Sequence, residues 1–516
     1  MPRVILSVSD KRGIVELAHT LSEQGWDLVA SGGTADVLRT VGLPVTPIEV
    51  ITGLPELLGG GIKTLHPAIH AGILARDDRE SDRDDLAAHG YAPVSMVVCN
   101  LSPFAETVRQ QNVTLDEAIE QLDVGGVTLL RAAAKNFARV TAVCDPEDYP
   151  RLIAMLRGAG EIDAATRHAL AIKAFAYIRN YDTEVHAFLL RQAPDNAASA
   201  AVDSPLPDAL SLGLVKTQEL EYGANPQQQA AFYALRAGTP PLGGRLIGGK
   251  TLTYQNVLDL DLAWQTVSAF AQPAAALVKG GFPIWIATGE PLATVIALLA
   301  ETSPPNAAAG VIAVNRLLDE PFAAALGPQL IEAIAAPEFT PTAQAKLSEL
   351  RRSCRLLTMP PDIQPGWELR SVRGGFLVQS SDRSDLRELA WQTVTNASPT
   401  LEQLKALQFA WRCVQFVPSH AIVLTQANNT VSVAGGSPDQ GEAVRLALQK
   451  AGANASATVL AADTPLTEAA SLHLAAAAGV MAVVQPGSSI HDSQVIAAAN
   501  ETGLAMIFTA VRHYRY

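Results

Sequence analysis

The sequence predicts an α/β protein in which a doubly wound parallel sheet is followed by a larger α/β region in two parts. As far as Asp145, short apolar runs alternate with segments of helical periodicity, which is typical of a parallel sheet with helices on both faces. The 516 residues exceed what one hydrophobic core organises. With 48% apolar and 17% charged residues, the chain can build several cores and is not intrinsically disordered.

The elements of the first domain follow from these runs. Buried strands are expected at residues 4–8 (VILSV), 27–31 (DLVAS), 94–101 (VSMVVCNL) and 139–144 (RVTAVC), because each is a short apolar run bounded by polar or glycine-containing segments. Helices are expected at residues 13–24, 34–41 and 115–122, where apolar residues recur at helical spacing. A longer helical segment is expected over residues 147–191.

Two stretches of the sequence divide the chain. Residues 191–211 are rich in Ala, Ser, Pro and Asp, as linkers and surface loops are. A second break is expected at residues 360–366 (PPDIQPG). We therefore expect a first domain over residues 1–146, a helical segment and linker over 147–204, and two subdomains over 205–360 and 361–516.

The charge balance narrows the class of partner. Lys and Arg total 38 and Asp and Glu total 51, a net charge of −13, which disfavours nucleic acid or an anionic membrane as the partner. No Cys-x-x-Cys pair or Cys/His cluster occurs, so we expect no metal site and interpret the cysteines as reduced, buried thiols. The amino terminus does not read as a signal peptide, and no apolar run reaches the roughly 18 residues of a membrane span. We expect a cytoplasmic protein that acts on a small molecule.

Three segments combine small residues with hydroxyl or basic side chains, a composition typical of anion-binding sites. The first contains Ser9, Asp10 and Lys11, the second is the turn Ser31-Gly32-Gly33-Thr34, and the third runs from Gly59 to Pro67 and contains Lys63 and Thr64. The carboxyl ends of parallel strands meet at one crevice, where N–H groups at helix starts face a bound anion. A plain strand-to-helix turn capped by Thr34 is the alternative for the second segment. Together the segments predict a phosphate site.

A fourth segment combines a carboxylate with basic residues. Asp123 precedes Gly125 and Gly126, and the segment ends at Lys135. If residues 127–136 are helical, Arg131 and Lys135 are neighbours on one face. A solvated basic face is the alternative interpretation, but the surrounding residues are apolar, and a cation in apolar surroundings needs a partner.

Other motifs are weaker. Residues 244–251 fit the P-loop pattern letter for letter but lack a preceding buried strand and a helix that starts at Lys250, so triphosphate binding is not expected. No His-x-Glu or Pro-Cys-x-x-Cys motif supports a zinc deaminase. His66, His70 and His420 are interpreted as structural, with a role for His66 beside Lys63 as the alternative.

These segments resemble, in order, the bifunctional purine biosynthesis enzymes that join 5-aminoimidazole-4-carboxamide ribonucleotide (AICAR) formyltransferase to IMP cyclohydrolase. The resemblance is carried by SVSDKRGIVELA, VASGGTADVLR, TGLPELLGGGIKTLHPAIHAGILAR and LDVGGVTLLRAAAKNFARVTAVCDPEDY. It continues through GGKTLTYQNVLDLDLAWQTV to the carboxyl-terminal QPGSSIHDSQVIAAANETGLAMIFTAVRHYRY. It implies a methylglyoxal-synthase-like first domain, a formyltransferase-like region with a cytidine-deaminase-like fold, and a homodimer.

The resemblance also implies residue roles. In the closure of formyl-AICAR to IMP, Lys63 would stabilise the oxyanion, Asp123 would orient and help deprotonate the amide, and Lys135 would donate or accept a proton. The nucleotide and its phosphate would be held by Ser9, Asp10, Lys11, Ser31, Gly32, Gly33, Thr34 and Gly125, and the base by Thr64, Cys99 and Asn100. The matching formyltransferase positions are Lys279, Tyr222, Asp463 and Arg512. Ring closure would need no cofactor, and 10-formyltetrahydrofolate would be the cosubstrate only of an active formyltransferase.

Four departures from the family pattern bear on activity. The family has Tyr where this chain has Ser102 and Arg where it has Gly61, which predicts slow ring closure. It has His where this chain has Gly280 and Arg where it has Glu221, so a general base is absent and a charge at an anion site is reversed. We therefore expect an IMP cyclohydrolase whose formyl transfer is lost or weak. The alternatives are the intact bifunctional enzyme and a non-catalytic nucleotide-binding scaffold.

Overall fold

The computed structural model describes residues 1–55, 58, 62–108, 113–192, 206, 210, 212–235, 238–302, 309–327, 329–361, 366–382 and 391–516. The chain divides into two compact units, Met1–Gly213 and Leu214–Tyr516. Gly61 and most of the linker expected at residues 191–211 lie outside the described residues.

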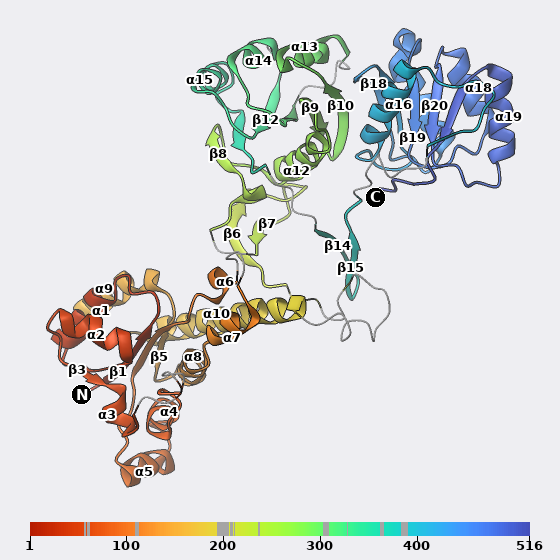
Figure 1. The fold of residues 1–516 in the computed structure, drawn as a ribbon. Coiled ribbons are helices and arrows are strands. Elements are labelled where there is room, and N and C mark those ends of the chain that lie inside the picture. The colour runs from red at the N-terminus through yellow and green to blue at the C-terminus, as the bar shows by residue number, and fades with distance from the viewer. Residues whose placement is uncertain are drawn as a thin grey trace. The chain divides into compact units, whose positions relative to one another are not determined.

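The first unit, red to yellow in Figure 1, is built on a parallel sheet with the strand order β3-β2-β1-β4-β5. Its strands are β1 (Arg3–Val8), β2 (Asp27–Ala30), β3 (Val45–Pro47), β4 (Met96–Asn100) and β5 (Thr141–Val143). In register, Val4 of β1 lies between Leu28 of β2 and Met96 of β4. The parallel sheet expected from the sequence is confirmed. β3 was not expected, because its three residues contain a threonine and a proline rather than an apolar run.

Helices cover both faces of this sheet. They are α1 (Ile14–Glu23), α2 (Gly32–Thr40), α3 (Ile48–Thr52), α4 (Pro67–Leu74), α5 (Glu80–His89), α6 (Phe104–Thr107), α7 (Leu115–Glu120), α8 (Gly125–Lys135), α9 (Tyr149–Ala159) and α10 (Ala164–Gln192), with a 3-10 turn at Pro146–Asp148. Alternate strand residues enter the two cores: Val4 and Leu6 pack with α1, α2 and α9, whereas Ile5 packs with α4, α8 and α10. This alternation is what a doubly wound sheet requires.

The helical segment expected over residues 147–191 is two helices. Gly160 adopts a left-handed conformation (φ 75°) and ends α9. The carboxylate of Asp163 then accepts the Thr166 N–H at 2.6 Å near the start of α10. The break therefore has a local cause that periodicity alone does not report.

The second unit contains a mixed sheet of 12 strands in the order β16-β21-β20-β19-β17-β18-β10-β9-β11-β12-β13-β8. The strands are β8 (Arg245–Gly248), β9 (Ala274–Lys279), β10 (Phe282–Thr288), β11 (Gly310–Val314), β12 (Ile331–Ala336), β13 (Arg355–Thr358), β16 (Gln392–Thr393), β17 (Ile422–Gln426), β18 (Asn429–Ala434), β19 (Val459–Ala462), β20 (Ala482–Gln485) and β21 (Ala505–Phe508). Two antiparallel pairs stand outside it, β6 (Val215–Leu220) with β7 (Ala230–Ala234) and β14 (Trp367–Val372) with β15 (Gly375–Ser380).

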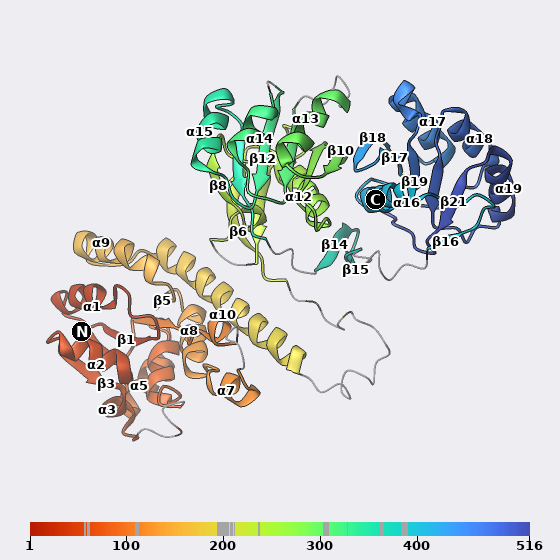
Figure 2. The ribbon, with the colours of Figure 1, turned by 45° about the horizontal axis from the view of Figure 1, so that its top comes forward.

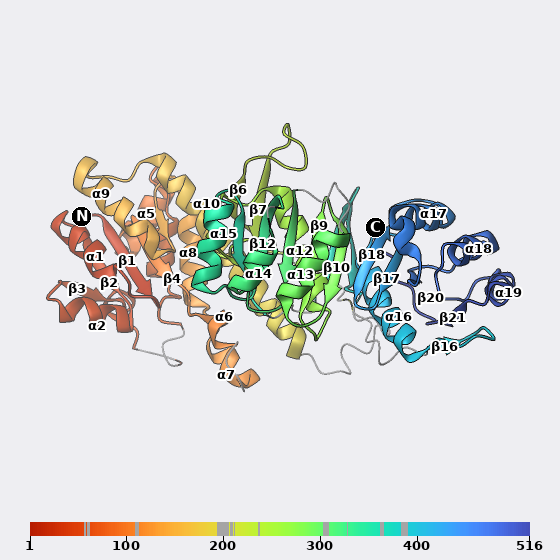
Figure 3. The same ribbon diagram turned by 90° about the horizontal axis from the view of Figure 1, so that it is seen from above.

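The helices of the second unit cover the large sheet on both faces. They are α12 (Tyr254–Ser268), α13 (Leu292–Thr302), α14 (Glu320–Ala325), α15 (Pro341–Leu350), α16 (Leu401–Val414), α17 (Gln440–Ala451), α18 (Ala469–Ala477) and α19 (Asp492–Thr502), with 3-10 turns at Pro241–Gly243 and Gly452–Ala455. α12 and α16 share one core, whereas the other helices form two cores on the opposite face. Figures 2 and 3 show α13 to α15 grouped over one half of the sheet and α17 to α19 over the other.

Candidate active site

The carboxyl ends of β1 and β4 mark the point at which the strand order of the first sheet reverses, which is where ligands bind in open α/β sheets. Asn100, the last residue of β4, joins the two ends. Its Oδ1 accepts the N–H groups of Ser9 at 2.6 Å and Asp10 at 2.7 Å, and its Nδ2 donates to the Asp10 carbonyl at 3.1 Å. The structure thus brings these three residues together, although the Asp10 carboxylate pairs with Arg12 at 2.6 Å.

The turn from Ser31 to Thr34 lies beside the end of β1, as expected for a phosphate loop. Ser31 donates from its hydroxyl to Ser7 at 2.8 Å, and the Thr34 hydroxyl both accepts the Val8 N–H at 3.1 Å and donates to the Val8 carbonyl at 3.2 Å. The Lys11 ammonium donates to that same carbonyl and to Thr34 Oγ1. Burial lowers the pKa of Lys11. These contacts hold the amino terminus of α2 beside two hydroxyls and a cation, a suitable place for an anion.

Lys63 reaches this turn from a segment far along the chain. A Cβ atom built on Gly32 would lie 2.7 Å from the Lys63 Nζ, so the ammonium group rests against the Gly32 Cα at the start of α2. Gly32 has a φ of 30°, whereas Gly33 has room around it. A glycine at position 32 is therefore what allows the ammonium to approach the helix start.

Asp123 lies at the start of α8, on the same edge of the sheet. Its Oδ1 accepts the Gly126 N–H at 2.7 Å, and a Cβ on Gly126 would lie 2.7 Å from both Asp123 Oδ2 and Leu101 Cδ2. Asp123 is thereby placed beside the end of β4. Lys63 thus lies at the turn after β2, and Asp123 lies beside the end of β4. Since β2 and β4 flank β1, the ends of these two strands are about 10 Å apart, two strand spacings.

Two tyrosines of α10, which belong to none of the sequence motifs described above, support this edge. The Tyr177 hydroxyl accepts the Leu101 N–H at 3.0 Å, and the Tyr181 hydroxyl accepts the Asp123 N–H at 2.9 Å. Burial raises the pKa of Tyr177 to about 12 and also raises the pKa of Tyr181. The available signal was the pair of tyrosines four residues apart on a helix, which places both hydroxyls on one face.

Thr64 and Cys99, which are expected around the base, are both buried, and two histidines lie close to Thr64 in the chain. Thr64 is buried, and His70 of α4 bonds to its backbone; burial lowers the pKa of His70. His66 caps α4, because its Nδ1 accepts the Ala68 N–H at 3.1 Å. The Cys99 side chain belongs to the hydrophobic core, and burial together with the charge of Asp123 raises its pKa well above the ordinary value.

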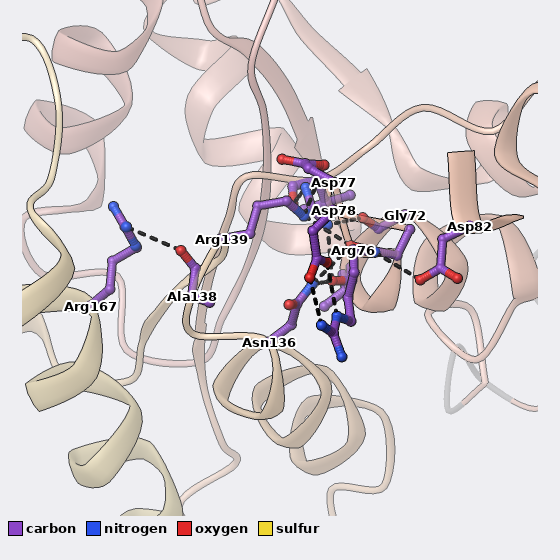
Figure 4. Close-up of polar contacts among 12 residues, drawn as sticks. Gly72, Arg76, Asp77, Asp78, Asp82, Asn136, Ala138, Arg139 and Arg167 are labelled. Carbon is purple, nitrogen blue, oxygen red and sulfur yellow. Dashed lines mark hydrogen bonds and ion pairs between the residues drawn. The ribbon is translucent and has the colours of Figure 1, made fainter. Parts of the chain in front are cut away.

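Lys135 lies at the far end of α8. The helix covers 11 residues, so Asp123 and Lys135 are about 18 Å apart along its axis. Beyond Lys135, Asn136 donates to the carbonyls of Ile73 and Ala75, and Arg139 donates to four carbonyls between residues 72 and 94. Figure 4 shows Asn136 and Arg139 with the neighbouring Gly72. The structure does not bring Lys135 to Asp123, and the role of Lys135 stays a prediction.

In the second unit, Lys279 and Gly280 lie in a tight hairpin turn. Gly280 and Gly281 both have positive φ, and their N–H groups donate to the Asp259 carboxylate at 2.9 Å and 2.6 Å. Lys279 is the last residue of β9 and pairs with Phe282 across the turn. The geometry accounts for both glycines, since a two-residue turn with positive φ at both positions favours glycine.

Asp463 and Arg512 lie in the other half of the large sheet: Asp463 directly follows β19, and its carbonyl accepts the N–H of His513, the residue after Arg512. Asp463 is fully buried; it accepts the Ser419 hydroxyl and the Ala421 N–H, and burial raises its pKa. An open cavity of about 480 Å³ beside it is lined by residues that include Arg512, His420, Thr464 and Tyr514. Neither Lys279 nor Tyr222 lines this cavity.

The described residues also limit other chemistry. Within them, no group of three or more His, Cys, Asp or Glu side chains is placed to hold a metal ion. No described helix is both long and apolar enough to cross a membrane. At the P-loop-like residues 244–251 the chain forms the edge strand β8, and α12 begins only at Tyr254.

Comparisons with known proteins identify two families along the chain. The model of the MGS-like domain matches residues 13–128, and the model of the AICARFT/IMPCHase bienzyme matches residues 133–450. Proteins named "Bifunctional purine biosynthesis protein PurH" from Desulfitobacterium hafniense and Anoxybacillus flavithermus are 42% and 41% identical to this chain, and each match covers 100% of this chain and 99% of the relative. The protein of the same name from Chloroflexus aurantiacus is 41% identical over 100% of this chain and 98% of its own length.

A solved structure titled "Crystal structure of ForH" is 38% identical, with a TM-score of 0.34, and covers 36% of this chain and 95% of its own. The family resemblance drawn from the sequence motifs is confirmed by the family models and by the full-length relatives.

Proposed function

This chain belongs to the AICARFT/IMPCHase bienzyme family, and from that premise we propose that it carries both activities for which the family is named. The first unit would close formyl-AICAR to IMP. The second unit would transfer the formyl group from 10-formyltetrahydrofolate to AICAR. The geometry of the first unit supports the proposed ring closure. The full-length match to relatives named bifunctional supports the proposed formyl transfer.

Ring closure sets three demands on the first unit. The carboxamide nitrogen attacks the formyl carbon, a C–N bond forms, and the formyl oxygen leaves as water after passing through an oxyanion. A cation must therefore stand at the oxyanion and a proton acceptor near the amide. Lys63 supplies the cation, Asp123 the acceptor, and the amino terminus of α2 with Lys11 an anchor for the substrate phosphate.

The contact between Lys63 and Gly32 is the observation on which this assignment rests. Gly32→Ala places a methyl group where the ammonium lies, whereas Gly158→Ala in α9, away from the site, meets nothing within 4 Å. Because a shift of about 1 Å in a reacting group can cost about a hundredfold in rate, we expect Gly32→Ala to lower the rate of IMP formation by that order and Gly158→Ala to keep it near the wild-type value. Ultraviolet absorbance follows the conversion; equal rates for the two variants would contradict the assignment.

Formyl transfer has a rival interpretation, in which the second unit has lost this activity. It rests on Gly280 and Glu221, which replace residues that the family uses as a base and an anion ligand, and on the structural use of Gly280 in the β9–β10 turn. Neither family models nor relatives indicate such a loss. The decisive assay is formyl transfer from 10-formyltetrahydrofolate to AICAR by the purified chain. Turnover comparable with ring closure supports the bifunctional enzyme, and no turnover leaves the cyclohydrolase alone.

We also propose a homodimer, and the β14–β15 hairpin supports it. Both strands are exposed almost throughout, and the Phe376 and Leu377 side chains are 61% and 62% exposed. An isolated two-stranded hairpin is marginally stable in water, so apolar side chains on it favour a partner surface. Phe376→Asp with Leu377→Asp should weaken self-association in sedimentation velocity, whereas Arg373→Glu at the turn should not. An unchanged dissociation constant for the double variant would argue against this contact.

The state of the cysteines supports a cytoplasmic location for this enzyme. Cys99, Cys144, Cys354 and Cys413 are all free and buried, which is typical of proteins kept in a reducing compartment. Fractionation of cells that express the chain, with activity followed in each fraction, tests this location.

A further inference from the structure

The outward face of α10 carries an ordered stripe of exposed side chains. Its members, spaced alternately by three and four residues, are Ile172, Phe175, Arg179, Asp182, His186 and Leu189. Ile172 is 60% exposed, Phe175 41% and Leu189 42%. The opposite face of α10 packs into the core of the first unit through residues such as Ala174 and Ile178. This spacing is that of a helix whose stripe packs along another helix.

The stripe is symmetric about a point between Asn180 and Tyr181. Arg179 and Asp182 are equally distant from it, as are Phe175 and His186, and Ile172 and Leu189. If α10 packs antiparallel against α10 of a second copy, each residue meets the other member of its pair. Ile172 then faces Leu189 of the second copy, and Arg179 faces Asp182 of the second copy. The two Ile172–Leu189 contacts of the pair therefore flank its two Arg179–Asp182 ion pairs.

The charges at the centre of the stripe favour this orientation. The Arg179 guanidinium donates to the Asn180 side chain at 2.9 Å, and within the described part of the chain neither Arg179 nor Asp182 has an ion-pair partner. A parallel pairing would set Arg179 against Arg179 and Asp182 against Asp182, which is unfavourable. Beside the stripe, an open hollow of about 430 Å³ between Arg131 of α8 and the α10 residues offers space for side chains of a second helix.

We propose that α10 is a self-association surface, on which two copies of this chain pack their α10 helices antiparallel about a twofold axis between residues 180 and 181. This goes beyond the proposed homodimer, because it assigns a contact and its register in the first unit. The inner flank of the same helix holds the backbone of Leu101 and Asp123 through Tyr177 and Tyr181. Pairing would therefore brace the edge of the sheet at which the candidate site lies.

Cysteine cross-linking of the full-length chain tests the register. Phe175→Cys combined with His186→Cys places a thiol of one copy opposite a thiol of the other in the antiparallel pair. Mild oxidation should then yield a disulfide-linked dimer, which a reducing agent converts back to monomers. Either single variant should not cross-link, because the same residue in the two copies is then about 16 Å apart along the helix axis. The native cysteines are buried, so they should not cross-link under the same conditions.

A second pair and a charge exchange make the test specific. Ile172→Cys with His186→Cys uses the same face in the wrong register and should give little cross-linking. In the 175/186 cysteine background, Arg179→Asp or Asp182→Arg alone should reduce the yield, and the double exchange should restore it. Absence of a covalent dimer from the 175/186 pair, or equal yields from the off-register pair, would overturn the proposal. No step of the test measures catalysis, so its failure is distinguishable from a failure of the proposed function.

Discussion

Gly126 is the position at which a single methyl group tests the placement of Asp123. Gly126 lies in the first turn of α8, and its N–H donates to Asp123 Oδ1 at 2.7 Å. A Cβ at this position would lie 2.7 Å from Asp123 Oδ2 and 2.7 Å from Leu101 Cδ2. Gly126→Ala therefore forces the carboxylate or the end of β4 to move.

The size of the effect follows from three opposing contributions. Alanine in place of glycine in a helix stabilises by about 0.5–1 kcal/mol. Forcing a methyl group into a filled space costs about 1–3 kcal/mol, and loss of a side-chain contact to the helix start costs about 1 kcal/mol. We expect Gly126→Ala to lower the free energy of unfolding by about 1–3 kcal/mol. A carboxylate displaced by up to about 1 Å would also lower the rate of ring closure by about a hundredfold.

Gly158 offers a matched control in the same unit. It lies inside α9, and a Cβ there meets nothing within 4 Å, so Gly158→Ala should stabilise by about 0.5–1 kcal/mol and leave the rate unchanged. Urea denaturation measures the unfolding free energies, hydrogen exchange of the α8 and α9 amides locates the change, and the conversion of formyl-AICAR to IMP gives the rates. If Gly126→Ala behaves like Gly158→Ala in both respects, the reasoning about Asp123 is wrong.

Two further predictions concern groups that support the site. Tyr181→Phe removes the acceptor of the Asp123 N–H, so the unfolding free energy should fall by about 1 kcal/mol and ring closure should slow; an unchanged rate would separate Tyr181 from the site. Burial holds the pKa of His70 below its ordinary value of 6.5, so the unfolded chain binds a proton that the folded chain excludes, and stability should fall as the pH drops below that value. Urea midpoints between pH 5 and 8 measure this dependence, which His70→Gln should reduce.

The sequence was informative where structure follows from local pattern. Short apolar runs predicted β1, β2, β4 and β5, because a strand buried on both faces needs no polar alternation. β3 has too few residues and too mixed a composition to form such a run. The end of α9 depends on one glycine, Gly160, in a left-handed conformation, and an isolated glycine in a helical pattern does not by itself report whether the helix continues.

The candidate site was predictable in its segments and not in its closing contacts. Strand order brings Ser9, Asp10 and Asn100 to one point, as parallel topology requires. The contact of Lys63 with Gly32 and the tyrosine bonds from α10 join residues that no local pattern links. The placement of Lys135 was available from the sequence in principle, because a helix of the expected length already separates it from Asp123 by about 18 Å.

Gly280 allows the two interpretations of the second unit to be compared in one protein. Gly280 and Gly281 both have positive φ, and a Cβ on either meets nothing within 4 Å. The Cβ of a histidine at either position therefore meets no clash, the left-handed backbone costs roughly 1–2 kcal/mol, and the N–H bonds to Asp259 can persist. Beside Lys279, only Gly280→His restores a base at the position where the family has one. If the missing base limits formyl transfer in this chain, Gly280→His should raise the rate by about a hundredfold, the lower end of the range for a positioned general base, and Gly281→His should leave it unchanged. Equal rates in wild type and Gly280→His, with efficient transfer in both, would mean that another group already serves as the base; equal rates near zero would place the loss elsewhere in the site, beginning with Glu221.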